Sequence, residues 1–307
     1  MKRNTSIVIL LATYNGEEFL AQQINSILNQ TNTNWKLLIH DDNSTDNTTH
    51  IIKQYQKKYP DKIHFFDDTA SFNSASANFN FLLKKAYSEY IMFCDQDDIW
   101  LPRKIELTFE KIKEMEKKYE DSPLLVHTDL KIVDSELNPV ANSYWKYQNI
   151  NPHKDAFTQL LVQNTITGCT VMINKNAAEL ASPVPNNIIM HDWWIGLVVR
   201  KFGHISQIDE STILYRQHKN NDTGAKKYSK YFIFKSAVSI LKKDCTKYKI
   251  QAEIFLNRYK NILDKDTIRM LNDFTGSKGR VVNLLKHKII KQGIIRNIGF
   301  FICQTKK

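Results

Sequence analysis

Residues 90–98 read Tyr-Ile-Met-Phe-Cys-Asp-Gln-Asp-Asp, and this stretch decides the fold. Its five apolar residues come directly before three carboxylates, a pattern typical of a buried strand that ends in a polar loop. Two other strand-like runs, residues 5–13 and 35–40, are followed by the polar segments 13–16 and 41–46. Because ligands bind beyond the carboxyl ends of parallel strands, we expect these polar segments to form one site.

Helix-like periods separate the strand-like runs in the first half of the chain. Apolar residues recur at helical spacing over residues 17–28, 46–58 and 77–87, and a further short strand is expected over residues 63–66. Repeated strand–helix units predict an α/β fold, in which helices flank a mostly parallel, Rossmann-like sheet on both faces.

Length and composition indicate a packed globular chain. With 307 residues, 42% of them apolar, it can form one large domain with a helical appendage, and disorder is excluded. We expect residues 1–225 to hold the sheet and residues 226–307 to form a basic, mainly helical region, with the boundary at residues 220–225. No apolar run reaches the ~18–20 residues of a membrane-spanning helix, and the start lacks a signal-peptide pattern. We therefore expect a cytoplasmic protein.

The net charge of +11 belongs to the C-terminal quarter. Residues 226–307 hold 20 Lys/Arg and 5 Asp/Glu, whereas residues 1–225 hold 23 and 27. Apolar residues recur at helical spacing from Tyr231 to Leu241, and they alternate with basic residues over 287–303. Such a region can contact an anionic membrane, or it can pack against the domain or a second copy in a homo-oligomer. Nucleic acid is disfavoured, because no nucleic-acid motif accompanies the charge.

The four cysteines are far apart in the sequence. Cys94, Cys169, Cys245 and Cys303 form no CxxC pair. We expect buried or incidental thiols rather than a disulfide framework or a zinc site.

The acidic loop that contains Asp95, Asp97 and Asp98 has two interpretations. Three carboxylates within four residues repel one another unless a cation or a donor is present, and Mg²⁺ or Mn²⁺ meets that need. Alternatively, the loop is a turn, with Asp98 capping the helix that starts near Pro102. Residues 41–46 leave the same choice open, since Asp, Asn and Ser are common in turns and caps.

Four motifs in this order resemble the family 2 glycosyltransferases, which have the GT-A fold. They are residues 12–16 (Ala-Thr-Tyr-Asn-Gly), 41–46 (Asp-Asp-Asn-Ser-Thr-Asp), 94–98 (Cys-Asp-Gln-Asp-Asp) and 191–194 (His-Asp-Trp-Trp). The resemblance implies inverting transfer of a sugar from a nucleotide diphosphate to a hydroxyl, with Mn²⁺ or Mg²⁺ as cofactor. Such a displacement needs a base for the acceptor's proton and a cation for the departing diphosphate.

The resemblance also implies roles for individual residues. Asp192 would be the catalytic base, and Asp97, Asp95 and His218 would hold the metal. The residues that bind the nucleotide sugar would be Thr13, Tyr14, Asp41, Asp42, Asp95, Arg216, Trp193 and Trp194. Structural roles are the alternative for some of them: Asp192 as a helix N-cap, the two tryptophans as core residues, and Arg216 as a structural contact.

Residues 94–102, 167–170, 191–194 and 215–218 look like the rhamnosyltransferase branch of this family. The branch implies dTDP-L-rhamnose as donor and a hydroxyl of a cell-wall or capsular polysaccharide precursor as acceptor, either polyprenol-linked or an oligosaccharide. Such an acceptor would place the protein at the inner face of the plasma membrane. A UDP-hexose donor remains the alternative, because few contacts separate a 6-deoxy sugar from glucose. The other alternative is a catalytically inactive nucleotide-sugar-binding protein.

Overall fold

Strands and helices alternate through the first third of the chain in the computed structural model, which describes residues 7–68, 70–219, 245–276 and 280–305. In chain order these elements are β1 (Ile7–Thr13), α1 (Leu20–Leu28), β2 (Trp35–Asp41), α2 (Thr48–Lys58), β3 (Ile63–Phe66), α3 (Ala75–Lys85), β4 (Tyr90–Cys94), β5 (Ile99–Trp100) and α4 (Lys104–Lys118). The elements expected from periodicity in this region are therefore confirmed, with ends that differ by a few residues.

The rest of the chain mixes short and long elements. They are β6 (Leu124–Val133), β7 (Pro139–Ala141), α5 (Tyr144–Gln148), α6 (Phe157–Leu160), the 3₁₀ helix η1 (Gly168–Thr170), β8 (Met172–Asn174), α7 (Lys175–Ala181), α8 (His191–Phe202), β9 (His204–Arg216), α10 (Thr246–Tyr259), α11 (Lys265–Thr275), α12 (Arg280–Lys286) and α13 (Ile294–Thr305). The expected boundary at residues 220–225 and the expected helix from Tyr231 to Leu241 lie outside the described residues.

The described strands form one sheet in the order β3-β2-β1-β4-β8-β6-β9-β5, and β7 pairs with β6. Strand β1 is parallel to β2 and β4, and β6 is parallel to β9, whereas β8 is antiparallel to β4 and β6. The expected parallel pairing is thus confirmed for β1 to β4, and the sheet as a whole is mixed, since β5 and β7 also pair antiparallel with their neighbours. In register, Thr13 lies beside Asp41 and Leu11 lies beside Cys94, so the polar loops after β1, β2 and β4 begin side by side.

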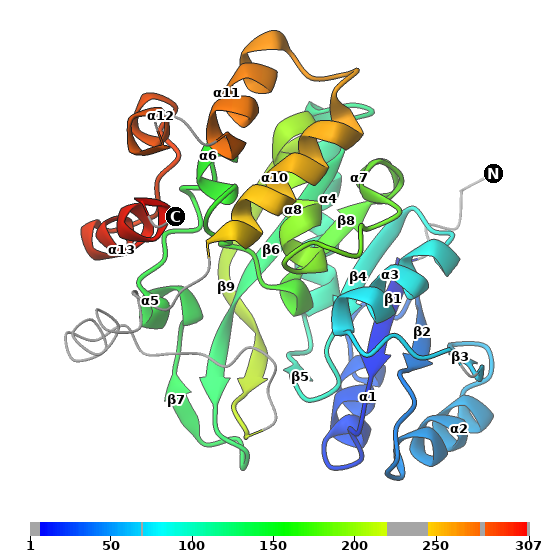
Figure 1. Ribbon diagram of the computed structural model, residues 1–307. Coiled ribbons are helices and arrows are strands. Elements are labelled where there is room, and N and C mark those ends of the chain that lie inside the picture. Colours follow the sequence, from blue (N-terminus) through cyan, green and yellow to red (C-terminus); the bar gives the residue numbers. More distant parts are fainter. Residues whose placement is uncertain (1–6, 69, 220–244, 277–279, 306–307) are drawn as a thin grey trace.

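The sheet is covered on both faces, and β1 shows why. Its residues Ile7, Ile9 and Leu11 belong to one buried cluster, with α1, α2 and α4. The intervening residues Val8 and Leu10 belong to a second cluster, with α3, α7, α8 and α10. Because side chains of a strand point alternately to opposite faces, a continuous apolar run predicts such double coverage. Figure 1 shows helices on both sides of the sheet.

The C-terminal helices pack through α10 on the part of the chain that forms the sheet. Phe255 is fully buried and its ring lies 5.8 Å from that of Trp194 on α8. A disulfide joins Cys245, just before α10, to Cys303 on α13, so the expectation of four unpaired thiols is wrong for this pair. The two cysteines are 58 positions apart, so no local sequence signal marks the bond. No helix within the described ranges has the length and apolarity to cross a bilayer.

Candidate functional site

The loop after β1 is bound directly to the loops after β2 and β4. Gln96 accepts a hydrogen bond from the Tyr14 amide at 2.9 Å and donates one to the Tyr14 carbonyl at 2.8 Å. The amide of Asn15 donates to Ser44 Oγ at 2.7 Å. The three polar segments expected to converge therefore do so, and the side chains of two segments bind the backbone of the third.

Asp41, at the end of β2, joins the end of β1 to the loop after β2. Its carboxylate is buried and accepts hydrogen bonds from Thr13 Oγ1 at 2.7 Å, from Ser44 Oγ at 2.6 Å and from the Ser44 amide at 2.7 Å. Ser44 therefore serves the loop and not a helix cap, since the N-cap position of α2 is Asn47. The side chain of Tyr14 is 57% exposed and is free to line a base pocket.

The neighbouring Asp42 fixes the approach to α3. Its carboxylate is buried and accepts hydrogen bonds from the amides of Phe72 at 2.5 Å and Ser74 at 3.2 Å. Ser74 in turn caps α3 by accepting a hydrogen bond from the amide of Ala77. Asp42 therefore joins the ends of β2 and α3 at the edge of the sheet where a nucleotide base would lie, and its contact with a base stays a prediction.

The acidic loop meets the end of β9 through a carboxylate–imidazole pair. Asp97 Oδ2 lies 2.7 Å from His218 Nε2, and both side chains are mostly buried. The two residues are 121 positions apart, and the family resemblance implies that both hold the metal. A depression of about 590 Å³ lies beside this pair and is lined by Glu18, Gln217, His218 and other residues.

Arg216 positions the acidic loop from within the protein. It is 2% exposed, and its guanidinium donates to the carbonyls of Asp97 and Ser135 and to the side chain of Gln22. Its cation also lies 4.4 Å from the centre of the Phe19 ring. This geometry favours the structural alternative over a direct contact with the diphosphate.

Asp98 is the buried carboxyl of the acidic loop. It accepts a hydrogen bond from the amide of Arg216 at 3.1 Å and is not a cap of α4, whose N-cap position is Arg103. Burial, reinforced by the charges of Asp97 and Asp95, raises the pKa of Asp98 well above its usual value.

A lysine beneath this loop was missed by sequence reasoning. Lys104 is fully buried, and its ammonium group lies 4.6 Å from the centre of the Trp100 ring, with no hydrogen-bond partner in the described part of the chain. Burial lowers its pKa to about 8, an effect that the nearby thiols and Asp98 oppose. Lysine is usually exposed, so nothing in the sequence distinguished this one.

The 3₁₀ helix η1 lies in space between the acidic loop and the start of α8, and it contacts both. Potential ligand atoms of Cys169, Asp95 and Asp98 all lie within 4.8 Å of one another. The preceding residue, Gly168, lies against Asp192: a Cβ at this glycine would be 3.4 Å from Asp192 Cβ and 3.2 Å from His191 Nε2. Consecutive residues of one turn thus contact the acidic loop and the candidate base, which places both at one site.

Asp192 has the properties of a base poised near neutral pH. It is partly buried in the first turn of α8, whose N-cap position is Met190, so the N-cap alternative is wrong. Burial raises the pKa of Asp192 to about 6, although hydrogen bonds to the Trp193 and Gly168 amides and to the Asn164 side chain oppose the shift. Residues 167–170 were among those that resemble the rhamnosyltransferase branch, but the sequence did not predict that Gly168 and Cys169 contact Asp192 and the acidic loop.

The residues on either side of Asp192 belong to the core. Trp194 is fully buried and its indole donates to the Ala181 carbonyl at 3.0 Å, while Trp193 is 8% exposed and donates to the Leu160 carbonyl. A platform for a sugar needs an open ring face, so the prediction that these tryptophans bind the sugar does not fit their burial. His191 is buried against Phe79 and Phe93, and burial lowers its pKa to about 3.

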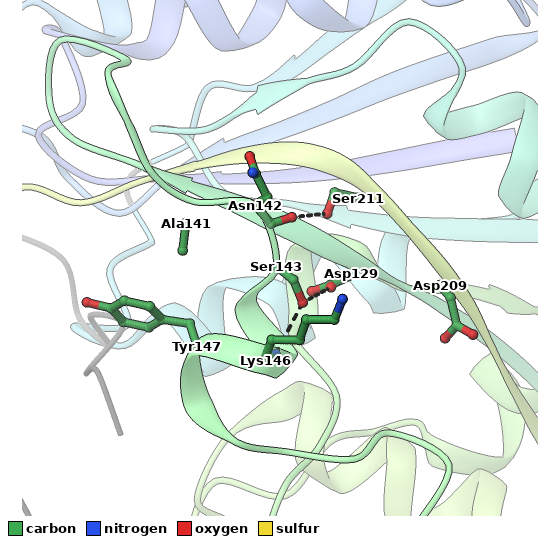
Figure 2. A pocket seen from close by; sticks show the side chains of 8 residues that line it. All are labelled: Asp129, Ala141, Asn142, Ser143, Lys146, Tyr147, Asp209 and Ser211. Atoms are coloured by element: carbon green, nitrogen blue, oxygen red, sulfur yellow. Dashed lines mark hydrogen bonds between the residues drawn. The ribbon is translucent and has the colours of Figure 1, made fainter. Parts of the chain in front are cut away.

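Figure 2 shows a second pocket, of about 460 Å³, beside α5, β6 and β9. The carboxylate of Asp129 lies in it, but Ser143 Oγ and the amides of Leu130 and Tyr144 donate to this carboxylate. Asp129 therefore holds the start of α5, and we assign it no catalytic role. Tyr144, at the start of α5, lies near enough to Asp192 to sense its charge. Burial, with the charge of Asp192, raises the pKa of Tyr144 to about 12.

Comparison with known proteins identifies similar chains among the glycosyltransferases. The family model described as Glycosyl transferase family 2 matches residues 8–178. The chain is 32% identical over 224 residues to dTDP-rhamnosyl transferase RfbG of Shigella flexneri, which covers 70% of this chain and 74% of that protein. It is 26% identical over 205 residues to UDP-Glc:alpha-D-GlcNAc-diphosphoundecaprenol beta-1,3-glucosyltransferase WfgD of Escherichia coli, which covers 66% and 73%.

Two solved structures show the same fold. The structure of S. aureus TarS 1-349 in complex with UDP-GlcNAc is similar with a TM-score of 0.51 at 19% identity, over 96% of this chain and 89% of that one. Mannosyltransferase PcManGT from Pyrobaculum calidifontis, in complex with GDP-Man and Mn²⁺, is similar with a TM-score of 0.53 at 11% identity, over 92% and 72%. The expected GT-A type of α/β fold is thereby confirmed.

Proposed function

The chain belongs to glycosyl transferase family 2, and we propose that it is a metal-dependent inverting enzyme that transfers L-rhamnose from dTDP-L-rhamnose. The acceptor is a hydroxyl of a cell-wall or capsular polysaccharide precursor, polyprenol-linked or an oligosaccharide. One observation carries the proposal: the turn Gly168–Cys169 brings the Asp192 carboxyl and the acidic loop to the same site. The identity of 32% to a dTDP-rhamnosyl transferase supports the choice of donor.

Asp192 is the base in this proposal. With a pKa of about 6 it is ionised at neutral pH, yet it is basic enough to accept a proton from the acceptor hydroxyl as that hydroxyl attacks. The amide and side-chain hydrogen bonds around it orient the carboxylate. The leaving diphosphate departs on the side of the acidic loop.

Asp95, Asp97 and His218 are the proposed ligands of the divalent cation. Carboxylate oxygens suit Mg²⁺ and Mn²⁺, and Asp97 already lies 2.7 Å from the imidazole. The chemistry that the cation supplies when bound is neutralisation of the departing diphosphate. Thr13, Tyr14, Asp41 and Asp42 form the nucleoside side, while Asp98 and Arg216 position the loop. The place of action is the cytoplasmic face of the plasma membrane, where a polyprenol-linked acceptor would be found.

A donor panel tests the proposal. The protein is incubated with dTDP-L-rhamnose, dTDP-D-glucose, UDP-glucose or GDP-mannose, with Mn²⁺ or with EDTA, and the release of nucleoside diphosphate is measured. We expect the largest release from dTDP-L-rhamnose and its loss in EDTA. Comparing dTDP-L-rhamnose with dTDP-D-glucose separates recognition of the sugar from recognition of the nucleotide.

The second candidate donor is a UDP-hexose, which the resemblance to WfgD favours. Release of UDP from UDP-glucose in preference to dTDP from dTDP-L-rhamnose would replace the first proposal with this one. Binding of a nucleotide sugar without release of diphosphate in any arm, even with a crude polysaccharide precursor added, would indicate a catalytically inactive binding protein.

A further inference from the structure

Four exposed apolar side chains gather on the last two helices. Val282 and Leu285 on α12 are 70% and 57% exposed, and Ile294 and Ile298 on α13 are 80% and 52% exposed. Members of each pair are three or four residues apart, so each pair lies on one face of its helix. We refer to these four side chains as the apolar surface. With Ile302 on α13, which is 40% exposed, five of the ten large exposed apolar side chains in the described residues thus lie on these two helices.

The opposite sides of these helices are anchored to the protein. Leu284, Ile289 and Phe300 are buried in the cluster that includes α8 and α10. Lys291 donates to the hydroxyl of Tyr248 at 2.9 Å, and the Cys245–Cys303 disulfide ties α13 to the start of α10. The inner faces therefore fix α12 and α13, and the four side chains of the apolar surface remain exposed. Both helices lie at the edge of the molecule, far from β3 (Figure 1).

The chain around the apolar surface is basic throughout. Residues 274–307 contain eight Lys/Arg and no Asp/Glu. Lys286 and Lys288 are exposed at the end of α12. The carboxylate that contacts this helix, Asp273, is already paired with Lys286 at 3.2 Å and with His287 at 2.8 Å. Asp273 offsets only part of this charge, and an apolar surface in a segment with excess positive charge fits a partner that offers both an apolar interior and anionic groups.

We propose that α12 and α13 dock the protein on a membrane surface rich in anionic phospholipid. The four apolar side chains enter the boundary between headgroups and acyl chains, and Lys286 and Lys288 contact lipid phosphates. A second copy is the weaker candidate, because a symmetric contact would bring two basic surfaces together and like charges repel. This docking is independent of the donor sugar and of catalysis.

Vesicle sedimentation tests the proposal. The full chain is mixed with vesicles of phosphatidylcholine alone or with one-third phosphatidylglycerol, and bound protein is measured after centrifugation. We expect binding to the anionic vesicles that high salt weakens. The combined variant Val282→Ser, Leu285→Ser, Ile294→Ser and Ile298→Ser should bind at least ~10-fold less, and Lys286→Gln with Lys288→Gln several-fold less. Ile262→Ser, which removes a 60% exposed isoleucine between α10 and α11, is the matched control and should bind like the wild type.

Thermal unfolding and dTDP binding show which variants are folded, and the pair Ile294→Ser and Ile298→Ser replaces the combined variant if the latter does not fold. Unchanged vesicle binding by a folded apolar variant would overturn the proposal, as would equal binding of the wild type to neutral and anionic vesicles. If the wild type does not bind vesicles but forms dimers in light scattering, and if the apolar variant is monomeric, the surface contacts a second copy instead. Loss of donor turnover with intact vesicle binding would count against the proposed function alone.

Discussion

The acidic loop at residues 95–98 and the first turn of α8 both carry carboxyls of the site, but they are built in opposite ways. The loop is tied by hydrogen bonds to Tyr14, after β1, and to Arg216, at the end of β9, through Gln96, Asp97 and Asp98. The start of α8 is held by apolar packing, with His191 and Trp194 buried on either side of Asp192. The loop therefore holds three carboxyls close together at fixed positions, whereas the helix places a single carboxyl in a partly buried position beside the loop.

This contrast separates two tasks of the proposed reaction. A cation site needs several carboxylates that stay charged, and backbone hydrogen bonds can hold them in place before the cation arrives. A general base needs a carboxylate that accepts a proton near neutral pH, and partial burial provides it. Substitutions in the two regions should accordingly change different measured quantities.

The largest effect is expected from Asp192→Asn, which removes the base. General-base catalysis typically contributes ~10²–10⁴-fold, so the turnover rate should fall by that much while donor affinity barely changes. The folded-state pKa of about 6 lies above the unfolded value of 3.8, so the ionised carboxylate costs stability above pH 6 and the cost vanishes below about pH 4. Asn removes this cost, and the variant should gain about 1–3 kcal/mol at pH 7.

Steady-state rates and denaturant unfolding check this pair of effects, with Asp209→Asn at an exposed carboxyl as control. If Asp192→Asn kept near-normal turnover and lost stability, the carboxyl would be structural and the base would have to be sought elsewhere around the site.

A smaller effect is expected from Asp97→Asn, in the acidic loop. Loss of this carboxylate should weaken donor binding in Mn²⁺ by at least ~10–100-fold, and should leave binding of the metal-free nucleoside nearly unchanged, because Asp97 acts through the cation. Calorimetric titration with dTDP, with and without Mn²⁺, measures both quantities. Asp67→Asn, at an exposed carboxylate that pairs with Lys53, is the matched control. Equal losses with and without Mn²⁺ would contradict a metal-ligand role.

The pH dependence of the reaction should follow Asp192. Its pKa of about 6 means that the fraction of ionised base falls ~10-fold per pH unit below 6, and kcat/KM should fall with it and level off above pH 7. Donor affinity measured over the same pH range is the control, since a matching fall in affinity would attribute the profile to donor binding. A profile that is flat between pH 5 and 7 would exclude Asp192 as the titrating base.

The regular elements of the first half were predictable because their signals are local. The strand over residues 63–66 and the strand that ends at Cys94 need only a short apolar run between polar segments, and both are found at the expected residues. The convergence of the polar loops was also predictable, because parallel strands share one carboxyl edge.

Other features depend on partners far along the chain. Nothing near Trp194 shows that α10, some sixty residues later, covers its ring. Nothing near Cys245 identifies Cys303 as its partner. The role of Gly168 is visible only once η1 lies against α8, because it depends on space and not on residue type.

The smallest effect is expected from Trp194→Phe, which tests the assignment of this residue to the core. The variant loses the indole hydrogen bond to the Ala181 carbonyl and part of a ring that packs on Phe255, and it should lose about 1–3 kcal/mol of stability. Trp35→Phe is the matched control, because Trp35 is also buried but its indole nitrogen has no hydrogen-bond partner in the described ranges. It should lose about 0.5–1.5 kcal/mol less than Trp194→Phe, the usual contribution of one hydrogen bond.

Donor affinity decides between the two interpretations of Trp194. A core tryptophan can be replaced by phenylalanine with less than about a twofold change in the Kd for dTDP-L-rhamnose, since the ring touches no ligand. A sugar platform would lose affinity with little loss of stability, because the exposed face of its ring would contribute to binding and not to the core. Reduced affinity at unchanged unfolding free energy would therefore return Trp194 to the sugar site, and would mean that α10 moves away from α8 when the donor binds.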